Sequence, residues 1–209
     1  MEKKIAILSG VEKYYAKKLK EFGATSKGVD WNSEESQKLR FDKLVNIINK
    51  NSSFSLLDYG CGFGAMYPYL KNIFGNNFAF TGFDISIQMI NEALILHNEP
   101  NAKWINNINE ATRVDYVIAS GIFNVRLDHT KEDWEEYILE TLIQLNSLSI
   151  KGFAFNMLTS YSDKEFMKNH LYYANPATFF DFCKRNFSKY VVLRHDYPLY
   201  EFTIEVKKD

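Results

Sequence analysis

The chain has 209 residues, of which 46% are hydrophobic and 16% aromatic, and its formal net charge at pH 7 is -1. This length suits one well-buried domain and is short for two. The balanced charge, with no long basic run, argues against a nucleic-acid partner and favours a small-molecule substrate. No apolar stretch approaches the roughly twenty residues that cross a bilayer, and two cysteines make no disulfide framework, so we expect a cytoplasmic protein without a membrane partner.

Apolar runs alternate with helical patterns along the chain. We expect strands at 54–59, 78–84, 102–106, 114–120, 152–158, 190–194 and 199–206. We expect helices at 34–49, 65–74, 86–97, 130–148 and 176–186, with Ser86, Thr130 and Asn175 as N-caps. The alternation predicts an α/β fold: a seven-stranded, mostly parallel sheet with helices on both faces.

The segments outside this alternation also suggest an organisation. Residues 1–37 are expected to form an N-terminal helical extension or cap, and 38–209 the main domain. Within that domain, 160–175 is expected to be a lid-like insertion. The last two strands are joined by too few residues for a helical crossover, so they should form a C-terminal antiparallel hairpin.

A glycine-rich turn follows the first expected strand, where the sequence reads LLDYGCGFG from Leu56 to Gly64. Alternating glycines let the chain turn sharply and let a ligand lie against backbone, while the next helix can point its first amides at that ligand. Asp84 ends the second expected strand, where a carboxylate can accept both hydroxyls of a ribose. The pattern predicts a nucleoside cofactor at this end of the sheet.

Two classes of cofactor fit this turn. Gly60, Gly62 and Ala65 also satisfy the dinucleotide fingerprint, so a dinucleotide-dependent oxidoreductase is an alternative. A dinucleotide would bring its pyrophosphate close to Asp58, and like charges repel. S-adenosylmethionine has no phosphate, and its sulfonium and ammonium are cations. The acid before the glycines therefore favours S-adenosylmethionine.

At these residues the chain resembles the class I S-adenosylmethionine-dependent methyltransferases. LLDYGCGFG resembles their first motif, GFDIS resembles their second, and the order of elements agrees from about Lys38 onward. The resemblance implies a Rossmann-like fold, with S-adenosylhomocysteine as product. It also implies that Asp58 orders the glycine turn and the donor's amino group, and that Asp84 holds the ribose. Where the third motif usually places an acid for the adenine, this chain has Asn107, whose carbonyl can accept that hydrogen bond.

Further donor contacts are expected from the stretch before the first strand and from the strand ends. The fork geometry of Arg40 suits the donor's planar carboxylate, and Trp31 could wall the pocket. The residues expected to bind the donor are Trp31, Arg40, Asp58, Gly60, Cys61, Gly62, Gly64, Asp84, Ile85, Ser86, Asn107, Ile108, Ser120 and Gly121.

Methyl transfer from a sulfonium needs an aligned nucleophile and, for a hydroxyl, somewhere for its proton to go. His195 is the expected base, because imidazole titrates near neutral pH. Asn124 and Asn156, at the ends of neighbouring strands, are the other expected catalytic residues; all three could instead serve the loops. The expected acceptor contacts are Tyr14, Phe123, Tyr161, Tyr172, Tyr173, Arg194 and Tyr197. No metal is expected, since the four histidines lack short ligand spacing.

The remaining motifs bear on the acceptor. SGIFN, after the fourth strand, lacks the two prolines found in methyltransferases of nucleic-acid amines, which favours transfer to oxygen. WNSEESQKLRF, SGIFN and HDYPLYEF together resemble small bacterial methyltransferases that tailor surface polysaccharides. The resemblance implies O-methylation of a small polar metabolite, such as a sugar or phosphate-like modifying group. A non-catalytic regulatory protein that keeps the donor site is the other alternative.

Overall fold

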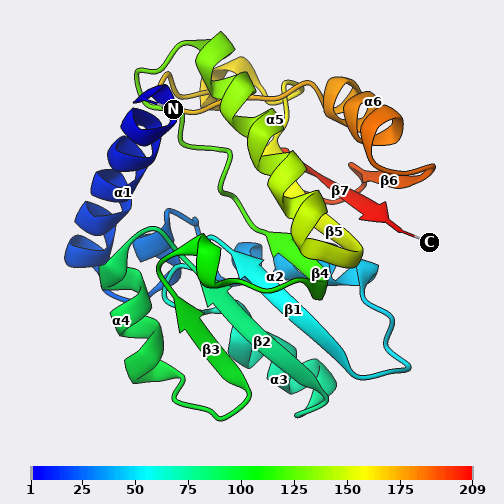
Figure 1. Ribbon diagram of the computed structural model, residues 1–209. Helices are drawn as coiled ribbons and strands as arrows, with labels where there is room; N and C mark the ends of the chain where they lie inside the picture. Colours follow the sequence, from blue (N-terminus) through cyan, green and yellow to red (C-terminus); the bar gives the residue numbers. More distant parts are fainter. Residues whose placement is uncertain (1, 209) are drawn as a thin grey trace.

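The computed structural model describes residues 2–208, which form an α/β fold around one seven-stranded sheet (Figure 1). The sheet order is β3-β2-β1-β4-β5-β7-β6. The strands are β1 (Phe54–Tyr59), β2 (Phe78–Phe83), β3 (Ala102–Ile105), β4 (Val114–Ala119), β5 (Ser149–Leu158), β6 (Tyr190–Arg194) and β7 (Glu201–Lys207). Neighbours from β3 to β5 pair in parallel, whereas β7 is antiparallel to both of its neighbours. The predicted fold class is confirmed.

The helices lie close to their expected positions. They are α1 (Glu2–Phe22), α2 (Glu34–Leu44), α3 (Met66–Phe74), α4 (Ile87–Leu96), α5 (Lys131–Leu148) and α6 (Pro176–Asn186). Short 3-10 turns occupy Ser26–Val29, Val45–Ile47, Ile108–Glu110 and Lys164–Phe166. The three expected N-caps are confirmed, because the side chains of Ser86, Thr130 and Asn175 each accept a backbone N–H from the first turn. The helix expected to reach 49 instead stops at Leu44 and continues as a 3-10 turn.

The C-terminal hairpin is also confirmed, with Arg194 opposite Thr203 and Tyr190 opposite Lys207. Strand β7 begins at Glu201 rather than at 199, because the Leu199 N–H donates to the carbonyl of Tyr197 in a tight turn. Since β6 runs parallel to β1, the hairpin tip lies at the edge of the sheet where the parallel strands end.

The core has two parts, one on each face of the sheet. Adjacent residues of β1 alternate between them, as the pleat requires. Leu56 packs with residues of α2 and α3, such as Phe41 and Leu70, while Leu57 packs with residues of α5, such as Trp134. Helices therefore cover both faces of the sheet, as predicted.

Helix α1 packs against α4 and α5 (Figure 1). Ile7 is buried in the core, and Lys3 and Lys4 form ion pairs with Asp133 and Glu140 of α5. The expected boundary between 37 and 38 falls inside α2. Among the described residues, no helix combines the length and the apolar character that crossing a membrane requires.

Candidate active site

The glycine turn after β1 is fixed by backbone hydrogen bonds. The N–H groups of Gly60 and Cys61 donate to the Phe83 carbonyl over 2.7 and 2.9 Å, and the Gly64 N–H donates to the Cys61 carbonyl over 2.9 Å. Gly60 has a φ of 81°, and a Cβ there would lie 2.3 Å from Cγ2 of Ile122. The turn needs glycine at position 60 for both its conformation and its packing.

Gly64 has a different role from the one expected. A Cβ at this position would lie 2.4 Å from Cη2 of Trp104 and 2.9 Å from Cδ2 of His97. It is absent from the residues that line the cavity beside the turn. The missing side chain therefore makes room for an indole of the protein rather than for the donor, so the expected donor contact is corrected.

Asp84 ties the glycine turn to the start of α4. One carboxylate oxygen accepts the Gly62 N–H over 2.9 Å, and the other accepts the Ser86 N–H over 2.8 Å. Asn106 donates from its side chain to the carbonyls of Asp84 and Ile85, which fixes the same corner. Each carboxylate oxygen keeps acceptor capacity, so the side chain can still receive a pair of hydroxyls.

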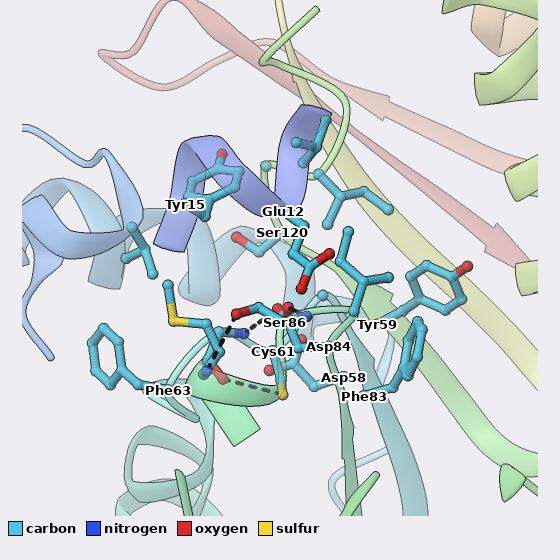
Figure 2. A pocket seen from close by; sticks show the side chains of 18 of the residues that line it. Glu12, Tyr15, Asp58, Tyr59, Cys61, Phe63, Phe83, Asp84, Ser86 and Ser120 are labelled. Carbon is cyan, nitrogen blue, oxygen red and sulfur yellow. Dashed lines mark hydrogen bonds between the residues drawn. The ribbon is translucent and has the colours of Figure 1, made fainter. Parts of the chain in front are cut away.

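A cavity of about 290 Å³ opens at the carboxyl ends of β1, β2 and β4 (Figure 2). Its lining includes most of the residues expected to bind the donor: Trp31, Asp58, Gly60, Cys61, Gly62, Asp84, Ile85, Ser86, Ile108, Ser120 and Gly121. We call it the donor cavity. Most of the residues predicted from the sequence therefore form the part of the wall that follows β1, β2 and β4.

Helix α1 supplies a part of the donor cavity that sequence reasoning missed. Lys4, Leu8, Glu12 and Tyr15 line the cavity, and Figure 2 shows Glu12 and Tyr15 projecting from this helix beside the glycine turn. Their spacing places them on one face of a helix. This periodicity is visible in the sequence and could have identified the part of the cavity wall that α1 supplies.

The donor cavity gathers acidic side chains. Asp58 is 2% exposed, and its burial together with the nearby Asp84 raises its pKa to about 8. Burial raises the pKa of Asp84 to about 6, although its two backbone donors counteract the rise, and Glu12 raises it further. Lys4 also lines the cavity, but its ammonium pairs with Glu140. The carboxylates therefore suit a cationic ligand such as S-adenosylmethionine and disfavour a pyrophosphate.

A second cavity, of about 850 Å³, adjoins the donor cavity, and Tyr15, Val29 and Trp31 line both. We call it the acceptor cavity. Its wall also includes the predicted residues Arg40, Asn124, Tyr173 and Tyr197, together with Lys168 and Glu201. A ligand in the acceptor cavity would therefore lie next to one in the donor cavity.

Arg40, expected at the carboxylate of the donor, lines the acceptor cavity and not the donor cavity. It is 5% exposed and forms an ion pair with Glu201, with Nε 2.9 Å and Nη2 2.6 Å from the carboxylate. Its guanidinium also stacks on Trp31, 4.0 Å from the ring centroid. A buried cation needs such a partner, and the sequence could not show one 161 residues away.

The two asparagines hold backbone and neighbouring side chains. Asn156 is fully buried and lines neither cavity, because Oδ1 accepts the Gly121 N–H over 2.8 Å and Nδ2 donates to Glu201 over 2.5 Å. Its expected catalytic role is therefore corrected to a positioning one. Asn124 Oδ1 accepts the Leu158 N–H over 3.1 Å, but Asn124 also lines the acceptor cavity.

Two of the expected hairpin residues, Arg194 and His195, lie outside both cavities. His195 is exposed, with its ring centroid 5.8 Å from that of Tyr161, which is itself 72% exposed. Arg194 pairs with the buried Glu205 on β7. The hairpin tip does lie at the edge of the sheet where the parallel strands end. It presents Tyr197 to the acceptor cavity, whereas His195, the expected base, is not in its lining.

The other expected contacts line neither cavity and have structural partners. Phe123 is fully buried in the core, and the hydroxyl of Tyr172 donates to Glu135 over 2.6 Å. Tyr14 donates to Asp30 over 2.6 Å, and Asn107 Oδ1 accepts the Asn109 N–H at the start of a 3-10 turn. Residue type and position in the sequence do not reveal the direction of a side chain.

The comparisons with known proteins agree with this geometry. No protein-family model matches the chain. The chain is 46% identical over 165 residues, or 78% of its length and 99% of the relative's, to Rv1506c of Mycobacterium tuberculosis, a protein named as a methyltransferase. The fold is similar to that of DhpI in complex with SAM and HEP (TM-score 0.67, 14% identity, 95% and 96% of the two chains).

A second solved structure has the same fold. It is the magnesium protoporphyrin IX methyltransferase ChlM of Synechocystis PCC 6803 with bound SAM, with a TM-score of 0.57, 18% identity and coverage of 84% of this chain and 81% of that one. The glycine turn, Asp84 and the acidic cavity fit the same cofactor. The chain belongs to the S-adenosylmethionine-dependent methyltransferases of class I fold, with S-adenosylmethionine as cofactor and S-adenosylhomocysteine as product.

Proposed function

We propose that the chain methylates an oxygen of a small polar metabolite, a sugar or phosphate-like modifying group used in surface-polysaccharide biosynthesis. The observation that carries the proposal is the acceptor cavity of about 850 Å³, which shares Tyr15, Val29 and Trp31 with the donor cavity. The donor supplies an electrophilic methyl group. The contribution of the protein is to hold the acceptor oxygen in line with it and to exclude water.

The wall of the acceptor cavity supports a small polar acceptor. It includes the aromatic rings of Trp31, Phe166, Tyr173, Tyr197 and Tyr200. Tyrosine and tryptophan offer both an apolar face and a hydrogen-bonding group, which suits a sugar ring. In this proposal residues 1–37 act as a cap on the site, and 160–175 as the lid-like insertion beside it.

Transfer to oxygen is supported by the sequence after β4. SGIFN lacks the prolines of methyltransferases that act on nucleic-acid amines, and the net charge of -1 offers no attraction to a polyanion. We also propose a cytoplasmic location, in keeping with two free, buried cysteines, Cys61 and Cys183.

The test is methyl transfer itself. The purified protein is incubated with S-adenosylmethionine carrying an isotopic label in its methyl group and with a protein-free small-molecule extract of the source cells. We expect a small labelled product whose fragmentation places the methyl on oxygen. A labelled amine or thioether would contradict O-methylation. Donor-dependent thermal stabilisation without any transfer would favour a non-catalytic regulatory protein.

A further inference from the structure

The acceptor cavity keeps two hydrogen-bond donors on largely buried side chains. Arg40 uses Nε and Nη2 to bind Glu201, whereas Nη1 is buried without a partner among residues 2–208. Asn124, which is 6% exposed, accepts a bond through Oδ1, and its Nδ2 donates to no other described residue. An unpaired buried donor is costly, so a ligand that accepts from it gains affinity.

The acidic groups of the same wall are already engaged. Glu201 receives Arg40 and Asn156, and Asp30 receives the Tyr14 hydroxyl and the Lys18 ammonium at 2.8 Å. The charge on Arg40 is therefore balanced, but its remaining N–H groups are not used. The wall offers a ligand more donors than acceptors.

Two further groups have the same polarity. The Tyr173 hydroxyl accepts the backbone N–H of Lys168 over 2.9 Å, which leaves its own proton to donate. The ammonium of Lys168 is exposed at the cavity wall and has no carboxylate within ion-pair distance in the described chain. Lys168 gives the wall one positive charge that no partner balances.

We propose that the methyl acceptor carries an anionic oxygen group, a carboxylate or a phosphoryl group, which binds to Arg40 Nη1 and Asn124 Nδ2 with Lys168 nearby. Hydrogen bonds from charged donors to an anion are short and strong. Glu201 and Trp31 already hold the guanidinium in place, so little conformational freedom is lost on binding. The inference rests on the proposed function, since it concerns the acceptor of that reaction.

The first test separates the extract before the reaction. Anion exchange divides the protein-free extract into a retained fraction and a flow-through, and each is incubated with protein and labelled donor. We expect label in the retained fraction. Label only in the flow-through would overturn the anionic acceptor and leave the methyltransferase proposal intact, whereas label in neither fraction would count against both. Prior phosphatase treatment would remove a phosphomonoester acceptor and spare a carboxylate.

The second test uses Asn124→Asp on the retained fraction. Aspartate keeps the acceptor for the Leu158 N–H but replaces the donor by a negative charge. We expect KM for the acceptor to rise at least about tenfold, with S-adenosylhomocysteine affinity within about twofold of the parent. Asn76→Asp makes the same change on an exposed residue outside both cavities and serves as the matched control. An unchanged KM in Asn124→Asp would overturn the proposal.

Arg40→Lys keeps a cation for Glu201 but removes the guanidinium fork. We expect a higher acceptor KM and unchanged S-adenosylhomocysteine affinity. The opposite result, weaker product binding with an unchanged acceptor KM, would assign Arg40 to the donor and overturn the inference.

Discussion

The donor cavity and the acceptor cavity share a wall but differ in charge and in construction. The donor cavity contains three carboxylates, from Glu12, Asp58 and Asp84, whereas the acceptor cavity presents unpaired N–H groups and engaged acids. One side of the shared wall suits a cation and the other suits an anion. We therefore expect the two ligands to differ in charge, with a cation in the donor cavity and an anion in the acceptor cavity.

The two regions are also built from different kinds of sequence. Much of the donor cavity comes from two short stretches that follow β1 and β2, held together by hydrogen bonds such as the one from the Gly62 N–H to the Asp84 carboxylate. The acceptor cavity draws on segments from 15 to 201. Its central contact, between Arg40 and Glu201, depends on the whole fold.

The largest effect should follow from breaking that long-range contact. Glu201→Gln leaves the Arg40 charge buried without a carboxylate, and we expect the free energy of unfolding to fall by about 3–5 kcal/mol in urea denaturation. Glu99→Gln, which removes an exposed pair with Lys71, should cost less than about 1 kcal/mol. Similar losses in the two variants would contradict the expectation that the buried pair contributes more to stability than the exposed one.

The next effect concerns the donor side. Asp84→Asn removes the charge that receives the Gly62 and Ser86 N–H groups and the expected ribose contact, so S-adenosylhomocysteine affinity should fall about a hundredfold. Isothermal titration calorimetry measures it. Asp115→Asn, at the opposite end of the strands, is the control; unaltered affinity in Asp84→Asn would refute the ribose assignment.

The pKa of Asp58 predicts a pH effect with a defined sign. Because burial raises it to about 8, the folded protein without donor binds more protons than the unfolded chain between about pH 4 and 8. Its stability should therefore rise as the pH falls through that window, and less so in Asp58→Asn. Donor affinity should change the other way, increasing about tenfold from pH 6 to 7.5, because the cation needs the ionised carboxylate.

A smaller effect should arise at Glu12. Its carboxylate lines the donor cavity, so Glu12→Gln should weaken binding of the cationic S-adenosylmethionine about threefold more than binding of S-adenosylhomocysteine, which lacks the sulfonium charge. The ratio of the two dissociation constants is the measurement. Glu21→Gln, exposed on the same helix, should leave that ratio unchanged.

The smallest effect is expected at His195. It lies outside both cavities, so His195→Gln should change turnover by less than about twofold, against the roughly hundredfold loss expected for a general base. The pH profile of kcat should also be unaltered. A hundredfold loss would restore the sequence-based role.

The difference in construction between the two cavities explains which features could be predicted from the sequence. The fold, the hairpin, the N-caps and the glycine turn follow from local patterns, because each depends on residues close in the chain. The acceptor cavity does not: Asn156 and Arg40 were chosen for suitable chemistry, but each is bound to Glu201, which no local pattern connects to them. Tyr14 was the expected contact, but Tyr15 lines both cavities. Neighbouring residues of a helix point in different directions, so the two tyrosines cannot face the same cavity.

The contact between Trp31 and Gly121 limits how such an enzyme can change. A Cβ at Gly121 would lie 2.2 Å from the Trp31 ring, and Trp31 lines both cavities. A substitution at position 31 that reshapes one cavity should therefore also change the other. New acceptor preferences should therefore arise more readily along 162–173, where a substitution can remodel one chamber and leave methyl-donor recognition untouched.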